Sequence, residues 1–191
     1  KDYDLRRDSY LLDFPNNEVR QGFLTMIANS YLKPKDGNIS SWVIDSLILL
    51  EDGETAEFRD SLTAFLSSIA YDSHDSVKTP EATEKYFQYT FYLIMRLIGE
   101  SNCRLINEKR QAIGRVDCII ELKDYVYIFE FKLNGSADEA LRQIEEKNYA
   151  KPYFGDKRKV VCIGVNFSSE TMTVEEWKEM MMIDSSRAKC K

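Results

Sequence analysis

Residues 114–132 read GRVDCIIELKDYVYIFEFK, and this stretch decides the fold of the chain. Two runs of β-branched, aromatic and aliphatic residues flank the polar pair Lys123-Asp124, a pattern that predicts a β-hairpin. The tightest hairpin turns prefer Asn-Gly or Asp-Gly, so the turn pair is not ideal, but its position between two apolar runs still favours a turn. With Lys123 and Asp124 in the loop, Leu122 faces Tyr125, and the pairing of the two strands follows from that.

This register places two carboxylates side by side. Asp117 lies opposite Glu130 on one face of the sheet, because side chains alternate with a period of two along a strand. Lys132 lies on the same face, two residues further on. Carboxylates about 5 Å apart repel one another, and the apolar Ile119 and Ile128 beside them predict partial burial, which makes unpaired charge more costly. We therefore expect a positive group between them: Lys132, a neighbouring arginine or a divalent cation.

The Glu-x-Lys spacing alone is weak evidence for a site. It occurs four times, beginning at Glu121, Glu130, Glu145 and Glu176. Only the copy at Glu130 lies inside an apolar strand with an aspartate on the neighbouring strand. Spacing by itself leaves two alternatives open, a functional site and a structural salt bridge.

These residues resemble the PD-(D/E)XK nuclease superfamily, whose pattern is an aspartate followed, on the next strand, by Asp or Glu, any residue and Lys. Asp117, Glu130 and Lys132 match it, while Val116 stands where the family pattern has a proline. The resemblance covers residues 79–171 and is most specific over GRVD…YIFEFKLNGSADEALRQIEEKNYAKPY. This text looks like a bacterial branch in which a nuclease-like domain follows an AAA-type ATPase-like domain.

The resemblance implies an α/β (α+β) fold with a restriction-endonuclease-like αβββαβ core and a mixed sheet. It also implies phosphodiester cleavage that depends on Mg²⁺ or Mn²⁺. Asp117 and Glu130 would be metal ligands, joined by the backbone carbonyl of Phe131. Lys132 would orient the attacking water or stabilise the charge of the transition state.

Two more candidate site residues come from this resemblance. Glu84, in the first turns of an expected helix, would be the acidic residue that the family's first core helix directs at the metal. Gln143 would be the glutamine that relatives place beside the active site on the next helix. From the residues alone, Glu84 can equally be an ordinary first-turn acid and Gln143 part of a solvated helix face.

Residues 14–72 predict a small helical bundle, because apolar stripes recur at helical spacing over 18–32, 40–50 and 55–71. No phosphate loop of the GxxxxGK[ST] type is present in the sequence. By resemblance this helical subdomain is the tail of an ATPase-like domain without its nucleotide-binding core. We therefore expect two domains, a helical subdomain over 1–78 and a nuclease-like domain over 79–191.

The remaining elements of the second domain follow from caps and apolar runs. We expect a helix over 79–98, a strand over 102–109, a helix over 137–150 with Ser136 as its N-cap, and a buried strand over 160–165. The pattern of residues 174–182 fits either a strand or a helix. The only histidine, His74, lies in a polar linker and receives no role.

Charge is distributed unevenly along the chain. The formal net charge is −6, which argues against nonspecific nucleic-acid binding over the whole surface. Residues 103–160, however, carry 12 basic and 10 acidic side chains and hold the hairpin. We expect nucleic acid to bind through this segment, where Lys157, Arg158 and Lys159 are either a solvated strand end or contacts to backbone phosphates.

The four cysteines show no metal-binding spacing, and three of them sit in strand-like text, where cysteine is usually a small buried hydrophobe. We expect a reducing compartment, the cytoplasm, without zinc and without disulfides. No apolar run approaches the length of a membrane span.

Together these observations favour a metal-dependent nuclease that cleaves phosphodiester bonds of DNA or RNA through Asp117, Glu130 and Lys132. The alternative is a catalytically silent nuclease-like module that binds or regulates together with an ATPase-like partner domain. A third interpretation is a structural hairpin held by an aspartate–lysine bridge. The expected cofactor is Mg²⁺ or Mn²⁺.

Overall fold

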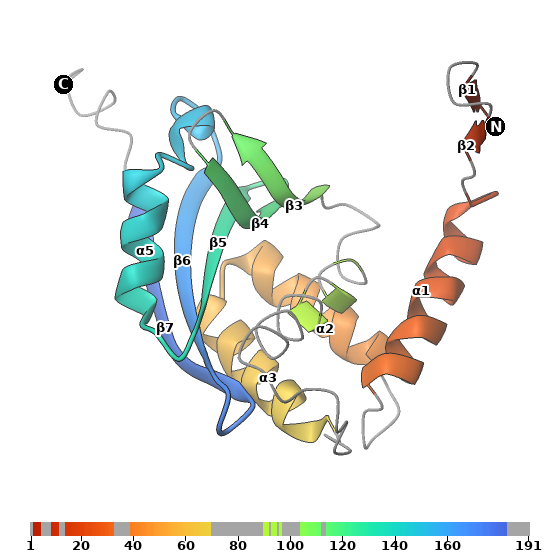
Figure 1. Ribbon diagram of the computed structural model, residues 1–191, viewed down its shortest axis with the longest axis horizontal. Coiled ribbons are helices and arrows are strands. Elements are labelled where there is room, and N and C mark those ends of the chain that lie inside the picture. The colour runs from red at the N-terminus through yellow and green to blue at the C-terminus, as the bar shows by residue number, and fades with distance from the viewer. Residues whose placement is uncertain are drawn as a thin grey trace.

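The structure is a computed structural model, and it describes residues 2–4, 9–11, 14–32, 39–69, 90–91, 93–94, 96, 104–111 and 114–182. Within these residues a five-stranded sheet separates helix α5 on one face from helices α2 and α3 on the other (Figure 1). The expected mixed α/β (α+β) architecture is confirmed.

The sheet is mixed, as expected. Its strands follow the order β3-β4-β5-β6-β7, and every neighbouring pair is antiparallel except the central pair β5 and β6, which is parallel. The parallel pair requires a crossover, and α5 supplies it. The strands are β3 (Arg104–Gln111), β4 (Gly114–Glu121), β5 (Tyr125–Leu133), β6 (Lys159–Ser168) and β7 (Thr173–Met182), and the helix is α5 (Ala137–Glu146).

The register of the β4–β5 hairpin is the predicted one. Cys118 pairs with Phe129 and Ile119 with Ile128. The Leu122 N–H donates to the Tyr125 carbonyl oxygen at 2.9 Å, which closes the turn over Lys123 and Asp124. The ambiguous segment after residue 173 is the edge strand β7, because it completes the hydrogen bonds of β6.

Helix α5 begins where the sequence predicts and ends earlier. The Ser136 hydroxyl accepts the Glu139 backbone N–H, so Ser136 is the N-cap. The helix ends at Glu146 and not at Ala150, because Asn148 takes a left-handed conformation with φ of 52°. A short 3-10 turn, η1 (Lys151–Tyr153), then leads the chain to β6.

Close packing of α5 on β6 depends on a glycine. A Cβ atom at Gly164 would collide with the Ala137 carbonyl oxygen and crowd the Leu141 backbone nitrogen. Only glycine allows the first turn of α5 to approach the sheet this closely. Gly164 pairs with Glu130 across β5 and β6, so this contact also sets the distance between α5 and the predicted site.

The N-terminal part is helical, as predicted. Its helices are α1 (Asn17–Leu32), α2 (Ile39–Asp52) and α3 (Thr55–Ser68), preceded by a small two-stranded sheet of β1 (Asp2–Asp4) and β2 (Ser9–Leu11). Helix α3 stops at Ser68 because Ile69 takes an extended conformation.

Helices α2 and α3 share a core with the sheet. Phe58 and Leu62 of α3 belong to the same buried apolar cluster as Phe129 and Ile163 of the sheet. The Tyr127 hydroxyl donates to the Leu50 carbonyl oxygen at 2.7 Å. The helices therefore cover the face opposite α5, and the division of the chain at residue 78 stays a prediction.

The helix expected over 79–98 is described at residues 90, 91, 93, 94 and 96, which are helical. There Phe91 packs on Phe129 and Phe131, on the face of the sheet away from α5. Glu84 and His74 lie outside the described residues. Among the described helices, none combines the length and the apolar content that a membrane span requires.

Candidate active site

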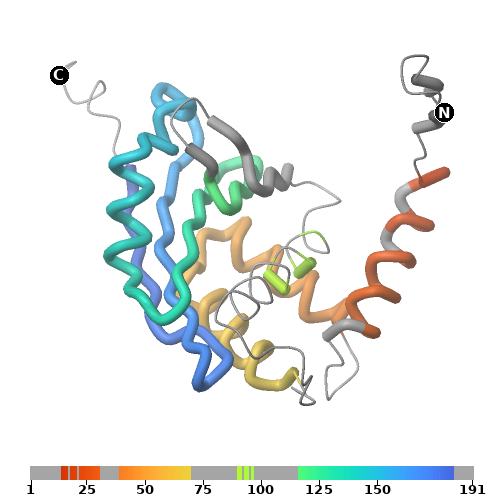
Figure 2. Tube along the Cα trace, in the orientation of Figure 1, coloured from red at the N-terminus to blue at the C-terminus, as the bar shows by residue number. Residues whose placement is uncertain are grey.

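Four of the five predicted side chains lie together on the α5 face of the sheet. Asp117 comes from β4, Glu130 and Lys132 come from the end of β5, and Gln143 comes from α5, which packs over this face (Figure 1; the tube of Figure 2 traces the same path). The hairpin register brings the two carboxylates to neighbouring positions, and the crossover helix adds the glutamine above them.

Glu130 is the buried member of the cluster, with 2% of its surface exposed. Its Oε1 atom accepts a hydrogen bond from Nε2 of Gln143. Its Oε2 atom is buried and has no hydrogen-bond partner within the described part of the chain. A buried carboxylate oxygen without a partner is costly, because nothing replaces the water that it lost on folding.

Asp117 is partly exposed, and its carboxylate is held against the next strand. Its Oδ2 atom accepts the backbone N–H of Phe131 at 3.0 Å. The bond fixes the carboxylate beside the peptide that links Glu130 and Phe131. The two acids of the motif therefore share one local environment, as the register predicted.

Lys132 and Gln143 form a bridge over Glu130. The Lys132 Nζ atom lies 2.6 Å from Oε1 of Gln143 and 3.9 Å from Oε1 of Glu130. The Gln143 amide thus accepts from the ammonium and donates to the carboxylate. This arrangement fixes both side chains and keeps the ammonium at the edge of the carboxylate.

The electrostatics of the cluster oppose a negative Glu130. Burial, and next the nearby charge of Asp117, raise the pKa of Glu130 to about 8. The charge of Lys132 and the hydrogen bonds from the Asp117 backbone and from Gln143 act in the opposite direction without overcoming burial. Burial and Asp117 therefore favour the protonated form of Glu130 as long as no further positive charge lies nearby.

Comparison with known proteins gives the family. The sequence profile of the PD-(D/E)XK nuclease superfamily matches residues 82–177, half of the chain. The chain belongs to the PD-(D/E)XK nuclease superfamily. It is also 29% identical over 168 residues to a protein of Azotobacter chroococcum mcd 1 described as an uncharacterized protein in the vnfD 5' region. That match covers 86% of this chain and 31% of the relative, so the chain spans about a third of the relative's length. No solved structure matches the chain.

Nucleases of this superfamily generally use divalent metal ions, and the donor set here fits one in part. Hard cations prefer carboxylate oxygens, and the unbonded Oε2 atom of Glu130 beside Asp117 offers them. In the part of the chain that the structure describes, no group of three His, Cys, Asp or Glu side chains is placed so that it could hold a metal ion. A metal would therefore need ligands besides these two acids, such as a backbone carbonyl, water or a side chain from elsewhere.

Sequence reasoning missed Asn166, which supports the site. This side chain is buried in β6 and pairs with Lys132 across the parallel strands. Its Oδ1 atom accepts the Gly135 N–H at 2.8 Å, and its Nδ2 atom donates to Glu175 at 3.0 Å. These bonds hold the loop between β5 and α5, and so the start of the helix that carries Gln143. The available signal was one asparagine inside the otherwise apolar run VVCIGVNF.

A second charged cluster lies at the other end of β5. Arg158 pairs with Asp156 at 2.7 Å and with Glu121 at 3.6 Å, and Glu121 also accepts the Tyr153 hydroxyl at 2.9 Å. The sequence left two interpretations of residues 157–159, a solvated strand end and contacts to backbone phosphates. Arg158 fits neither, because its guanidinium binds Asp156 and Glu121. The sequence gives no indication of that pairing, since Glu121 precedes Arg158 by a whole crossover.

Proposed function

We propose that the chain is a metal-dependent nuclease that cleaves phosphodiester bonds of DNA or RNA through Asp117, Glu130 and Lys132. The observation that carries this proposal is the buried Oε2 atom of Glu130, which has no hydrogen-bond partner among the described residues and lies beside a second carboxylate. A structural ion pair of equal burial would have its oxygens bonded. A cation-binding carboxylate keeps one available.

Asp117 and Glu130 would hold the metal, Mg²⁺ or Mn²⁺, with the carbonyl of Phe131 as a further ligand. The ion supplies a more acidic bound water and positive charge for the phosphate in the transition state. Glu130 itself must lose its proton to take part, and the neighbouring cation favours that loss in the way that any positive charge does.

Lys132 supplies a fixed positive charge at the edge of the site. Its ammonium is directed by Gln143 and remains within 3.9 Å of Glu130, so it can orient water or stabilise the oxygens that become negative during cleavage. Gln143 is a positioning residue, because it contacts both charged side chains and holds each by one hydrogen bond. Glu84 remains a proposed further acid from the first core helix.

The proposed substrate is nucleic acid, bound through residues 103–160, where basic side chains outnumber acidic ones. We propose that the chain acts in the bacterial cytoplasm, a reducing compartment in which cysteines such as the buried Cys118 and Cys162 stay reduced.

A second candidate function is a catalytically silent module that acts with an ATPase-like partner domain, the arrangement of the branch that the sequence resembles. Helix α1 favours a protein contact, because it exposes Val19, Phe23 and Met26 at one-turn spacing, with Met26 59% exposed. The relative from Azotobacter is about three times as long as the matched segment, so the segment there is part of a longer chain.

A cleavage assay separates the two functions. The wild-type chain should nick plasmid or cut single strands in Mg²⁺ or Mn²⁺ and be inactive in EDTA. Asp117→Ala and Lys132→Ala should abolish cleavage, because each removes a group that no neighbour replaces. Glu121→Ala, an equal truncation in the charged cluster near the start of β5, should retain it. Absence of metal-dependent cleavage of every DNA and RNA tested, with ATP present as well, would favour the silent module.

Metal binding can be measured without turnover. Mn²⁺ soaked into crystals should give anomalous density beside Glu130 in the wild-type protein and none in Asp117→Ala. Density that survives this substitution would place the ion elsewhere and remove the basis for the proposed metal site.

A further inference from the structure

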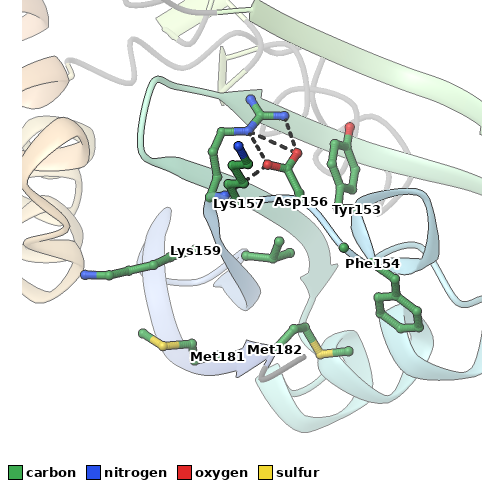
Figure 3. A pocket seen from close by; sticks show the side chains of 10 residues that line it. Tyr153, Phe154, Asp156, Lys157, Lys159, Met181 and Met182 are labelled. Atoms are coloured by element: carbon green, nitrogen blue, oxygen red, sulfur yellow. Dashed lines mark hydrogen bonds and ion pairs between the residues drawn. The ribbon is translucent and has the colours of Figure 1, made fainter. Parts of the chain in front are cut away.

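A pocket lies at the end of the sheet opposite the carboxylate cluster. It encloses about 270 Å³ and is formed by the segment after α5, the start of β6 and the end of β7. Figure 3 shows Phe154, Met181 and Met182 on one side of it and Lys157 and Asp156 on the other. The catalytic proposal uses none of these residues.

The pocket combines an apolar wall with basic side chains. Phe154 and Met181 are 61% and 56% exposed, which is unusual for side chains of this size and leaves much of the phenyl ring accessible. Val160 and Met182 continue the apolar surface inward. Apolar surface of this kind next to cations suits a ligand that is both flat and negatively charged.

The charge of the pocket is positive once its internal pairs are considered. Among the described residues that line the pocket Asp156 is the one acid, and Arg158 neutralises it with a bidentate ion pair. The exposed Lys157 and Lys159 remain. Lys159 donates to the Tyr125 hydroxyl at 3.0 Å and lies over the Tyr125 ring, so its ammonium is held on the face of the sheet away from α5, and Lys157 is the lysine that gives the pocket its charge. The pocket therefore carries a positive charge that attracts an anion, and none of its charged side chains is fully buried.

The pocket and the carboxylate cluster share one face of the sheet. Val160 and Met182 pack in the same apolar cluster as Val126 and Ile128, which lies under α5. Along the parallel pair, Lys159 lies beside Tyr125 and Gly164 lies beside Glu130. Five residues at about 3.3 Å each separate the two positions by about 16 Å. A stacked single strand with one phosphate per about 3.4 Å covers that distance in about five nucleotides.

We propose that this pocket binds one unpaired base of the nucleic-acid strand that is cleaved at Glu130, with the base on Phe154 and an adjoining phosphate near Lys157. The proposal rests on the proposed nuclease function for its choice of ligand. An unpaired base fits because stacking on an exposed ring requires a free π-face, which a base in a duplex does not offer. The substrate is then a single strand, or a duplex with a single-stranded segment about five nucleotides from the cut.

The test uses equilibrium binding in EDTA, where cleavage does not occur. The probe is a fluorescein-labelled oligothymidylate of about twelve nucleotides, compared with a strand of equal length and charge that contains abasic sites. Phe154→Ala should weaken binding of the oligothymidylate about tenfold, the usual size of one lost base stack, and should leave binding of the abasic strand unchanged. Lys157→Ala should weaken both strands and lower the salt dependence of binding.

Matched controls exclude a general loss of fold or charge. Phe23→Ala removes an exposed phenylalanine on α1, and Arg59→Ala removes a partly exposed basic side chain on α3, outside residues 103–160; both should bind like the wild type. Polyglutamate of equal charge should compete poorly. Equal binding of intact and abasic strands by the wild type, or equal competition by polyglutamate, would overturn the base pocket in favour of an acidic protein partner.

Cleavage and oligonucleotide binding, measured together, distinguish failure of the pocket proposal from failure of the proposed nuclease function. Metal-dependent cleavage that persists in the wild type, together with unchanged oligonucleotide binding by Phe154→Ala, would overturn the pocket alone. Base-dependent binding that Phe154→Ala removes, without cleavage in any metal, would support the pocket and overturn the nuclease.

Discussion

Strand β5 has a carboxylate cluster at each end, and the two clusters differ in how completely their charges are paired. At the first, Glu130 is buried, has an oxygen without a partner among the described residues, and has a pKa raised to about 8. At the second, Arg158 joins Asp156 and Glu121, and its hydrogen bonds lower the pKa of Asp156 to about 2. Both clusters lie on the α5 face and both combine two acids with one base.

The difference separates a structural ion pair from a candidate site. In the second cluster the guanidinium donates to both Asp156 oxygens and also to the Leu122 carbonyl oxygen, so the charges are satisfied within the fold. In the first cluster the base is a lysine that reaches the acid mainly through a glutamine. An arrangement that leaves an acid under-neutralised costs stability, and such perturbed groups concentrate at functional sites.

The largest expected effect is on cleavage. Glu130→Gln should lower the rate on the order of 1000-fold, because removal of a charged metal ligand costs several kcal/mol of transition-state stabilisation. Glu121→Gln, the matched change in the second cluster, should leave the rate within a factor of about two. Single-turnover rates on a labelled strand in Mg²⁺ measure both. Similar losses in the two variants would mean that the clusters do not differ in function.

A steric change should disturb only the first cluster. In Gly164→Ala the new methyl group collides with the first turn of α5, so the helix must shift and Gln143 with it. We expect a loss of about 2 kcal/mol in the free energy of unfolding and a fall in cleavage of about 10- to 100-fold. Urea unfolding and cleavage rates measure the two effects.

Gly22→Ala is the control for this change. It adds the same methyl group to open space on α1 and should leave cleavage unchanged. Full activity in a destabilised Gly164→Ala variant would show that the position of Gln143 has no influence on the reaction.

Stability in the absence of metal should change in opposite directions at the two clusters. The pKa of Glu130 is higher in the folded state than its ordinary value of 4.5, so the folded protein binds this proton more tightly than the unfolded chain does. The resulting stabilisation is fully present below pH 4.5 and is lost as the pH rises to about 8. Glu130→Gln should therefore be more stable than the wild type at pH 9, by about 2 kcal/mol, and should gain nothing at pH 5. Asp117→Asn should show a smaller gain at pH 9, because it relieves the repulsion between the acids.

Glu121→Gln should be less stable than the wild type at both pH values, since it weakens the pairing with Arg158. Urea unfolding in EDTA measures all three variants. A clear loss of stability in Asp117→Asn at pH 9 would indicate a structural salt bridge, the interpretation that spacing alone left open.

The hairpin and its register were predictable from the sequence because they depend on local rules. Alternation along two short strands and a two-residue break determine which side chains oppose one another, so Asp117 and Glu130 could be placed before any coordinates. The position of Gln143 needed the family resemblance, since periodicity alone left it on a solvated helix face. Glu84 lies outside the described residues, and its role stays a prediction.

The second cluster and the support of Asn166 were not predictable for a physical reason. Both depend on pairing between segments separated by the α5 crossover, which sequence spacing does not encode. Glu121 meets Arg158 only because β6 lies parallel to β5, and Asn166 meets Gly135 for the same reason. The early end of α5 depends on the left-handed conformation of Asn148, which an asparagine permits and does not require.

The smallest expected effect tests the second cluster alone. It is the loss of folding stability at low pH as Asp156 takes up a proton. Hydrogen bonds from the Arg158 side chain, and then from its backbone N–H, lower the pKa of Asp156 from 3.8 to about 2. A lowered pKa contributes stability that is present above pH 3.8 and is lost as the pH falls through 2. Because the Asp156 side chain is 23% exposed, water screens the pair, and we expect at most about 1 kcal/mol. Asp156→Asn should therefore be less stable than the wild type at pH 6, and the gap should close between pH 4 and pH 2 in urea unfolding. The pH dependence of Glu130 has the opposite sign, because its contribution is lost as the pH rises. A stability difference between Asp156→Asn and the wild type that stayed constant with pH would mean that the Arg158 pairing adds no charge-dependent stability. The contrast between the two clusters would then depend on burial alone.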